Sequence, residues 1–475
     1  TTVVSEWNRT WGDSQSDSGF GLALDSLNNI YITGTTNLED SNDILIMKYD
    51  SSGVLQWYHT VGGVEDEFGW GVTVDTFDYI YFAGQTENEM VLMKYDNMGV
   101  QQWYRTWGAT GRKVGRAVAV DSSNNAYLAG GPDGYWTGAD NMILVKYDSS
   151  GVLQWSRIWG GSEWDTAWGV VVDSLDYIYI TGTTESFGTG ESSAVLVKYN
   201  NSGAQLLNRT WGGLEIDESF GVAVDSSDNL YIGGRTRSFG AGDEDMLLVK
   251  YDSSGVQQWN RTWGGIDFDM GTGGVAVDSF DNVYLAGYTR SFGAGSYDII
   301  LVKYDNTGEQ QWNCTWGGFN TEVCWGVAVN SPDNLYIVGN TVHDVALVKY
   351  VPDIYNPIIY IKNPSRNAKF GDTAPNYDIT ILEPNLVSLW YTIDGGISNY
   401  TISQMSGSIN QMVWNSSPYG RIRLEFYAVD FKGNYGHNEV IIWKLKSTIP
   451  GYNLFLLILT ISAIVILRIK RKKKR

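Results

Sequence analysis

The chain has few of the residues that build metal centres and covalent cross-links. Its 475 residues include only two cysteines and three histidines. These counts exclude a multi-cysteine zinc site and a disulfide framework, and they argue strongly against a histidine-rich metal centre. Prolines are also few, at nine, and together with 55 glycines they are typical of many short strands joined by tight turns.

Motifs for catalysis are missing as well. The sequence has no G-x-S-x-G, H-E-x-x-H, Walker or dinucleotide-binding motif, and its three histidines, His59, His343 and His437, occur singly. We therefore predict no enzymatic activity, no cofactor and no metal site. Calcium at turn aspartates such as Asp225 or Asp228 is the less favoured alternative, because aspartates in turns usually satisfy backbone N–H groups.

The charge is unevenly distributed along the chain. The formal net charge is -20, but seven of the last eight residues are basic. The preceding 467 residues carry 53 acidic against 26 basic side chains, a net of -27. Such a body repels phosphate backbones, which excludes nucleic acid as its partner.

A long apolar run stands next to this basic end. Residues 452–469 are about 18 residues long and almost uniformly apolar, so they predict a transmembrane helix. The basic tail 470–475 then lies in the cytoplasm, and residues 447–451 form a linker. The body before residue 452 is expected outside the cell, after removal of a signal peptide.

An internal repeat with a period of about 52 residues fills most of the chain. The pair Lys-Tyr recurs seven times, from Lys48-Tyr49 to Lys349-Tyr350. One unit, Gly221–Gly265, contains four short strand patterns separated by turn residues, and no window shows a sustained helical period. Four antiparallel strands in each of seven units predict an all-β fold, a seven-bladed β-propeller.

The ends of the repeat predict that the ring closes. The chain enters with a fourth-strand pattern, Glu6–Gly12, and the repeat ends at Tyr350 after three strands. The N-terminal strand can therefore complete the last blade of a propeller domain spanning residues 1–351. An open solenoid is the alternative, but it would leave unpaired strand edges.

The pattern D-x-x-(D/N)-N-x-Y-x-x-G-x-T, as in Asp225–Thr236, resembles the SBBP (seven-bladed β-propeller) repeat of prokaryotic surface proteins. The resemblance covers residues 1 to about 350 and implies a propeller at the cell surface. It implies little about activity, because propellers host many functions.

Residues 352–446 form a second, smaller domain with short alternating strand patterns. The segments Trp390–Gly396 and Tyr427–Asn434 are similar to those of immunoglobulin-like sandwiches in archaeal and bacterial surface proteins. The antibody cysteine pair is absent, so the resemblance concerns architecture only. A spacer role is expected, and a second binding site is the alternative.

In six of the seven repeats an acidic residue stands six positions after the Trp-Gly anchor or its equivalent. The third repeat has Arg112, Lys113 and Arg116 in this region. Connections between propeller blades share one face, so the acids could form a negative funnel for cations or basic ligands. Alternatively, each acid hydrogen-bonds the backbone of a neighbouring blade. The candidate ligand-binding residues are Asp17, Glu67, Asp165, Asp217, Asp269 and Glu322.

Two further patterns carry structural hypotheses. Trp-x-Arg-x-Trp, as in Trp103–Trp107 and Trp155–Trp159, puts arginine beside indoles and favours packing between blades over sugar binding. Cys314 and Cys324, ten residues apart, could form a disulfide outside the cell or remain two buried thiols.

We therefore predict a single-pass, membrane-anchored protein that displays a propeller for binding or adhesion. Its partner would be an extracellular protein, a glycan or a cationic ligand. A surface glycan hydrolase or lyase is the first alternative, and a purely structural envelope component is the second.

Overall fold

The computed structural model describes residues 3–12, 16–38, 41–108, 111–132, 141–331, 334–352, 357–382, 386–430 and 434–446. The chain divides into two compact units, Thr1–Pro352 and Asp353–Arg475. Both consist mainly of β-strands, which confirms the all-β prediction.

The described residues of Thr1–Pro352 form seven antiparallel sheets, six of them with four strands. Consecutive strands of the chain pair in order within each of the first five sheets. Sheet 1 contains β2(Asp17–Leu24), β3(Ile30–Leu38), β4(Ser41–Tyr49) and β5(Leu55–Val61); sheet 2 contains β6(Phe68–Val74), β7(Ile80–Thr86), β8(Glu89–Tyr95) and β9(Gln101–Trp107); sheet 3 contains β10(Lys113–Val120), β11(Ala126–Pro132), β12(Met142–Tyr147) and β13(Leu153–Trp159).

The next two sheets repeat this order, and the sixth departs from it because its first strand is split. Sheet 4 contains β14(Asp165–Val172), β15(Ile178–Thr184), β16(Ser193–Tyr199) and β17(Gln205–Trp211); sheet 5 contains β18(Asp217–Val224), β19(Leu230–Thr236), β20(Asp245–Tyr251) and β21(Gln257–Trp263); sheet 6 contains β22(Asp269–Met270), β23(Val275–Val277), β24(Val283–Thr289), β25(Asp298–Tyr304) and β26(Gln310–Trp316).

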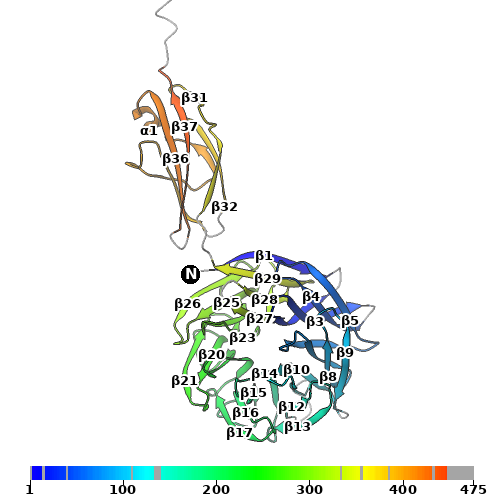
Figure 1. Cartoon of the computed structure of the whole chain (residues 1–475). Helices are drawn as coiled ribbons and strands as arrows, with labels where there is room; N and C mark the ends of the chain where they lie inside the picture. The colour runs from blue at the N-terminus through cyan, green and yellow to red at the C-terminus, as the bar shows by residue number, and fades with distance from the viewer. Residues whose placement is uncertain are drawn as a thin grey trace, which may run out of the picture. The chain divides into compact units, whose positions relative to one another are not determined.

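The seventh sheet joins the two ends of the repeat region. It contains β27(Val323–Ser331), β28(Asn334–Asn340), β29(Val345–Pro352) and, paired antiparallel to β29, β1(Val3–Trp11). The seven sheets surround a common centre, with the first strand of each sheet on the inside (Figure 1). This arrangement is a β-propeller.

The hydrophobic core lies between the faces of neighbouring sheets. The middle strands are buried on both faces; for example, all seven residues of β15 and all seven of β16 are buried. Ile178 and Ile180 of sheet 4 pack with Tyr127 and Leu144 of sheet 3. The same packing joins sheet 7 to sheet 1, where Val338 contacts the cluster around Ile32. Each sheet therefore gains most of its hydrophobic stabilisation from its neighbours.

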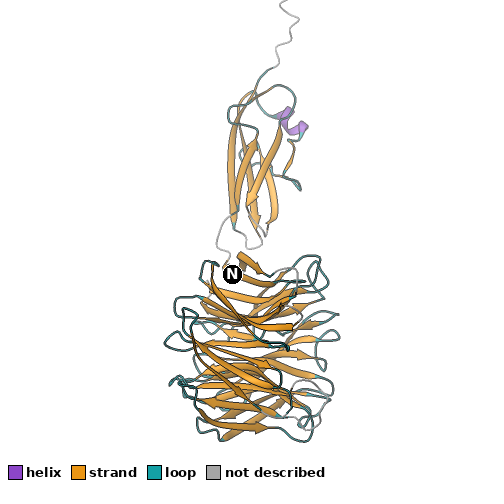
Figure 2. Ribbon diagram, turned by 90° about the vertical axis from the view of Figure 1, so that its right-hand side faces the viewer, coloured by secondary structure: helices purple, strands orange, loops and turns teal. Residues whose placement is uncertain are grey.

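Asp353–Arg475 forms two sheets around one core. The first sheet contains β30(Ile358–Asn363), β32(Asn376–Leu382) and β35(Ser406–Ser408), and the second contains β31(Lys369–Phe370), β37(Tyr435–Lys444), β36(Gly420–Asp430), β33(Leu386–Thr392) and β34(Tyr400–Thr401). Residues of both sheets pack around the fully buried Trp414. Trp414 belongs to α1(Gln411–Ser416), the one α-helix of the described residues, drawn purple in Figure 2.

No helix in the described part of the chain is long and apolar enough to cross a membrane. The predicted linker 447–451, spanning helix 452–469 and basic tail 470–475 lie outside the described residues.

Of the two alternatives for Cys314 and Cys324, the structure has the free thiols. Cys314 lies on β26 and Cys324 on β27, so they belong to different sheets. The Cys324 thiol contacts the Gly326 carbonyl oxygen at 3.5 Å. Burial raises the pKa of each thiol to about 12. Both therefore remain protonated at neutral pH and are poor nucleophiles for oxidation.

Candidate ligand-binding site

The predicted acid ring lies at the starts of the innermost strands, but its side chains are buried. Their exposed fractions are between 0% and 6%. The carboxylate of Asp217 accepts hydrogen bonds from the Thr236 hydroxyl, from the Gly213 N–H at 2.7 Å and from the Ser238 hydroxyl at 2.7 Å. Equivalent groups surround Asp165 and Asp269. These carboxylates therefore fasten the connection between two sheets.

The glutamates of the ring make fewer hydrogen bonds. Glu67 accepts the Gly63 N–H at 3.3 Å, and Glu322 accepts the Gly318 N–H at 3.0 Å. Burial raises the pKa of Glu67, with smaller contributions from nearby carboxylates. The backbone N–H of Asp17 donates to the His343 carbonyl oxygen at 2.7 Å, which joins sheet 1 to sheet 7. The six acids thus lie within the joints between sheets rather than on an open surface, and their geometry favours the structural alternative.

A different ring lies three residues further along each first strand. In six sheets this position falls at a shift in register, for example between Gly19 and Gly21 in β2. An irregularity of this kind takes one residue out of the ladder and re-aims its side chain. Small residues flank the position in every repeat, which is the sequence signal that could have identified it. The seven residues are Phe20, Trp70, Arg116, Trp168, Phe220, Thr272 and Trp325.

All seven side chains line one central pocket of about 290 Å³. Phe20 stacks on Trp70, with ring centroids 4.6 Å apart, and meets the edge of Trp325 at 5.7 Å. The opposite arc contains an edge contact between Trp168 and Phe220 at 5.5 Å. Five aromatic side chains therefore present ring faces and edges to the pocket.

Arg116 is the cation of this ring. Its guanidinium carbon lies 4.1 Å from the centre of the Trp168 ring, and its Nη1 donates to the Thr166 hydroxyl at 2.8 Å. The side chain is buried and held in place by these contacts. Arg116 therefore presents a fixed positive charge beside an indole face.

The sixth sheet leaves a gap in the aromatic ring. Nine positions separate Asp269 from Asp278, against eight between Asp217 and Asp225. The extra residue falls in a glycine-rich segment between β22 and β23, where Thr272 stands in the place of an aromatic residue. The pocket is consequently asymmetric.

Beside Thr272, buried ion pairs form part of the pocket wall. The Arg235 guanidinium lies 2.7 Å from Glu218 and 2.9 Å from Glu244. Although burial lowers the pKa of Arg235, these two carboxylates raise it above its ordinary value. The nearby Tyr288 hydroxyl has its pKa raised to about 12, mainly by burial. The charges of this network are therefore paired with one another.

Two indole N–H groups of the ring have no acceptor among the described residues. The buried Nε1 atoms of Trp70 and Trp168 make no hydrogen bond there, whereas Nε1 of Trp325 donates to the Asn340 amide oxygen at 2.7 Å. Buried donors normally have partners. Both nitrogens are shielded from solvent, so these two indoles border the pocket through their rings.

Residues 11–39 match the family model for a β-propeller repeat, SBBP. This match supports the resemblance drawn from the repeat pattern. The regulatory protein FlaEY of Caulobacter vibrioides is 28% identical over 117 residues, which are 22% of this chain and 12% of that protein's length.

Two bacterial structures are similar over most of the chain. The extracellular domain of a proposed one-component system from B. thetaiotaomicron aligns with a TM-score of 0.41 and 10% identity, over 91% of this chain and 57% of that domain. PorZ, a surface component of the type-IX secretion system of Porphyromonas gingivalis, aligns with a TM-score of 0.44 and 12% identity, over 89% of this chain and 59% of PorZ.

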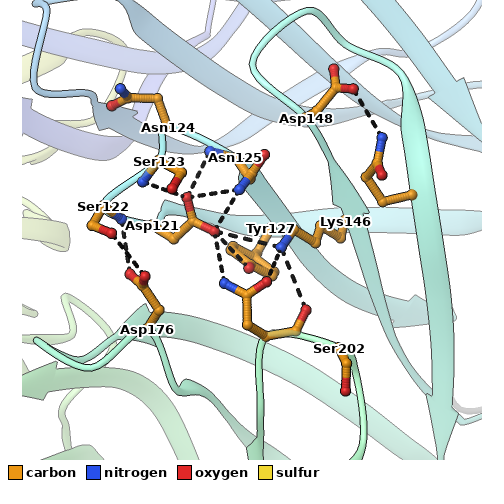
Figure 3. A network of polar contacts seen from close by, with 12 residues as sticks. Asp121, Ser122, Ser123, Asn124, Asn125, Tyr127, Lys146, Asp148, Asp176 and Ser202 are labelled. Carbon is orange, nitrogen blue, oxygen red and sulfur yellow. Dashed lines mark hydrogen bonds and ion pairs between the residues drawn. The ribbon is translucent and has the colours of Figure 1, made fainter.

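The aspartate, asparagine and tyrosine of the SBBP pattern form a repeated polar network. Figure 3 shows it around Asp121, whose carboxylate accepts the Ser123 and Asn125 N–H groups and the Tyr127 hydroxyl at 2.9 Å. Lys146, from the Lys-Tyr anchor, lies 3.6 Å from the same carboxylate. The network ties the first turn of a sheet to its second and third strands.

Asp225 and Asp228, the turn aspartates considered above as possible calcium ligands, hydrogen-bond to protein groups. Asp225 accepts the Ser227 and Asn229 N–H groups, and Asp228 accepts the N–H and hydroxyl of Ser174 from the preceding sheet. Asp228 has a φ of 60°, which aspartate tolerates better than most residues. Their oxygen atoms are thus committed to the turn and to the joint between sheets.

Where the Trp-x-Arg-x-Trp stripe occurs, it connects an outer strand to the next sheet. The Arg157 guanidinium lies 5.0 Å from the Trp155 ring centre, and its Nε donates to the Gly203 carbonyl oxygen at 2.6 Å. Arg105 makes the equivalent bond to Gly151 at 2.7 Å. The stripe therefore fixes the hairpin turn of the neighbouring sheet.

Proposed function

We propose that the seven sheets are the blades of a closed, seven-bladed propeller, and that its central pocket binds a ligand outside the cell without chemical turnover. The observation that carries this proposal is the ring of bulged side chains at Phe20, Trp70, Arg116, Trp168, Phe220 and Trp325. An apolar pocket with a few convergent polar groups is the usual form of a small-molecule site.

The chemistry of the pocket favours a glycan over a cationic ligand. Aromatic faces stack on the apolar faces of sugar rings, and the pocket is lined by aromatic side chains such as Trp70 and Trp168. Arg116 adds a guanidinium group to the pocket lining, and such a group is a common partner of sugar and carboxylate oxygens. A volume of about 290 Å³ holds a short glycan end rather than a long chain.

The charge network supports binding rather than hydrolysis. Glycoside hydrolysis needs one carboxyl group that donates a proton and a second that attacks or activates water. Glu218 and Glu244 are instead both held by Arg235. A surface glycan hydrolase or lyase and a structural envelope component remain the alternatives that the experiment separates.

We also propose that the chain is a single-pass surface protein with its propeller outside the cell. The apolar segment 452–469 and the basic tail 470–475 support this topology. The smaller unit would be an immunoglobulin-like sandwich. Its two sheets around Trp414 support that assignment.

Glycan-array binding by the full chain in detergent tests the proposed function. Trp168→Ala removes one face of the pocket and should weaken binding at least about tenfold, equivalent to about 1.4 kcal/mol. Trp168→Phe keeps a ring but loses the N–H group, so it should weaken binding less. Phe319→Ala, at a fully solvent-exposed aromatic, is the matched control and should bind like the wild type.

Other outcomes favour the alternatives. Shortened glycan products would indicate an enzyme. Absence of binding to any glycan, together with self-association of the chain, would favour a structural component.

A further inference from the structure

In the smaller unit, three side chains that could bind a metal ion lie together on the outer face of the larger sheet. Glu425 of β36 is directly opposite Glu439 of β37 in the register of the two strands. His437 precedes Glu439 by two residues, so the alternation of a strand puts both side chains on the same face. The sheet thus brings two carboxylates and one imidazole together.

The separations of these groups suit a common metal ion. One ligand atom from each of the three side chains lies within 4.8 Å of the other two. The Glu425 Oε1 and His437 Nε2 atoms are 3.6 Å apart. Ligand atoms at bond lengths of about 2.0–2.2 Å around tetrahedral zinc lie roughly 3.3–3.6 Å from one another. Small side-chain rotations therefore suffice for coordination.

Burial provides an independent indication of a ligand. Glu425 is only 6% exposed, and the Tyr427 hydroxyl interacts with its carboxylate, but its buried Oε2 atom makes no hydrogen bond of ordinary geometry within the described residues. Its other oxygen faces His437 and, at 3.9 Å, the Arg423 guanidinium. An unpaired buried carboxylate oxygen is unfavourable unless a cation or donor compensates for it. A metal ion at the cluster would supply that compensation.

Aromatic stacking orients the imidazole. The His437 ring lies 4.7 Å from the Tyr427 ring at an interplanar angle of 24°. Tyr427 in turn stacks on Trp390 at 5.6 Å and 16°. This stack across three strands limits rotation of the imidazole, which lowers the cost of ordering a metal ligand.

We propose that Glu425, His437 and Glu439 bind one divalent transition-metal ion, with zinc the best match to one nitrogen and two oxygen ligands. Three protein ligands leave a fourth position for water or for a group from a partner molecule. Arg423, 3.3 Å from Glu439, competes with the ion, but its side chain is 57% exposed and can rotate into solvent. The site is independent of the pocket in the propeller.

Isothermal titration of the chelator-treated full chain with Zn²⁺ tests this proposal. The wild type should bind a single ion per chain with saturation. Glu439→Gln, at an exposed position, should weaken binding at least about tenfold, and His437→Asn should do the same. His343→Asn removes an exposed histidine of the other unit and is the matched control.

A spectroscopic measurement distinguishes coordination from a structural role. Bound Co²⁺ should give visible absorption bands that disappear in His437→Asn and persist in His343→Asn. If the three groups are only a polar cluster that stabilises the sheet, the wild type will bind neither metal. Retention of Zn²⁺ affinity by both Glu439→Gln and His437→Asn would also overturn the proposal.

Discussion

At the scale of single residues, the carboxylates of the repeat act as hydrogen-bond acceptors that join one sheet to the next. Asp217 illustrates this, because its two oxygens receive two hydroxyl groups and one backbone N–H. An amide in its place would offer one acceptor oxygen and an NH₂ group that faces donors.

We expect Asp217→Asn to destabilise the propeller by about 1–3 kcal/mol, the usual cost of leaving buried polar groups without partners. Urea unfolding followed by tryptophan fluorescence measures the change. Asp243→Asn, at an exposed loop position, is the control and should have little effect. An unchanged midpoint for Asp217→Asn would show that the carboxylate is not needed for the joint.

Glu67 should give the propeller a distinct pH dependence. Because burial raises its pKa in the folded state, the folded protein binds the proton more tightly than the unfolded chain does. The ionised carboxylate therefore costs stability at neutral pH, and this cost disappears as the pH falls through the folded-state pKa.

Glu67→Gln should consequently be more stable than the wild type at about pH 7, with an advantage that shrinks towards about pH 4. Urea midpoints of both proteins across this range provide the measurement, and the exposed Glu65→Gln is the control. An advantage that grows as the pH falls would contradict the assigned direction of the shift.

At the scale of elements, β1 completes the seventh sheet and so joins the two ends of the repeat region. It pairs with β29 from Val3 to Trp11, and its Trp7 and Trp11 pack against the cluster that joins sheet 7 to sheet 1. Without β1, the edge of β29 would be left as an unpaired template for association with other chains.

Deletion of residues 1–12 should lower the melting temperature of the propeller by more than about 5 °C and promote self-association. Differential scanning calorimetry and light scattering measure the two effects. A synthetic peptide of residues 3–11 should restore both, whereas a scrambled peptide should not. Normal melting after the deletion would mean that β1 is dispensable.

The positions of most strands are predictable from the sequence repeat. The spacing of Lys-Tyr anchors and turn aspartates predicts short antiparallel strands, because local turn chemistry and alternation decide strand positions. The split strand in sheet 6 is harder to predict. It depends on one additional residue near Gly271–Gly274, whose effect emerges only when the strand packs beside the pocket.

The candidate binding sites are also only partly predictable from the sequence. The spacing of the acids correctly locates them in the connections, but spacing alone does not reveal whether a carboxylate faces solvent or a buried donor. The residue three positions later varies among phenylalanine, tryptophan, arginine and threonine, so no fixed motif marks it. Glu425 and Glu439 become neighbours only through the register of β36 and β37.

At the scale of the whole molecule, the two units can bind different classes of ligand. The propeller combines aromatic surfaces and hydrogen-bond donors in its central pocket, whereas the smaller unit combines anionic and imidazole groups on an open sheet face. Loss of one ligand through a point substitution should therefore leave the other unaffected, provided that the substituted residue is not needed for folding.

The pairing of β1 with β29 also has a consequence for biosynthesis. A ribosome makes β1 before the other strands of the propeller, yet its partner emerges only after nearly the whole repeat region has been translated. Until then the nascent chain has an unpaired first strand and an unfinished last sheet. A truncated chain cannot close its ring, so exposed strand edges would distinguish incomplete products from finished ones and make them targets for chaperones and proteases.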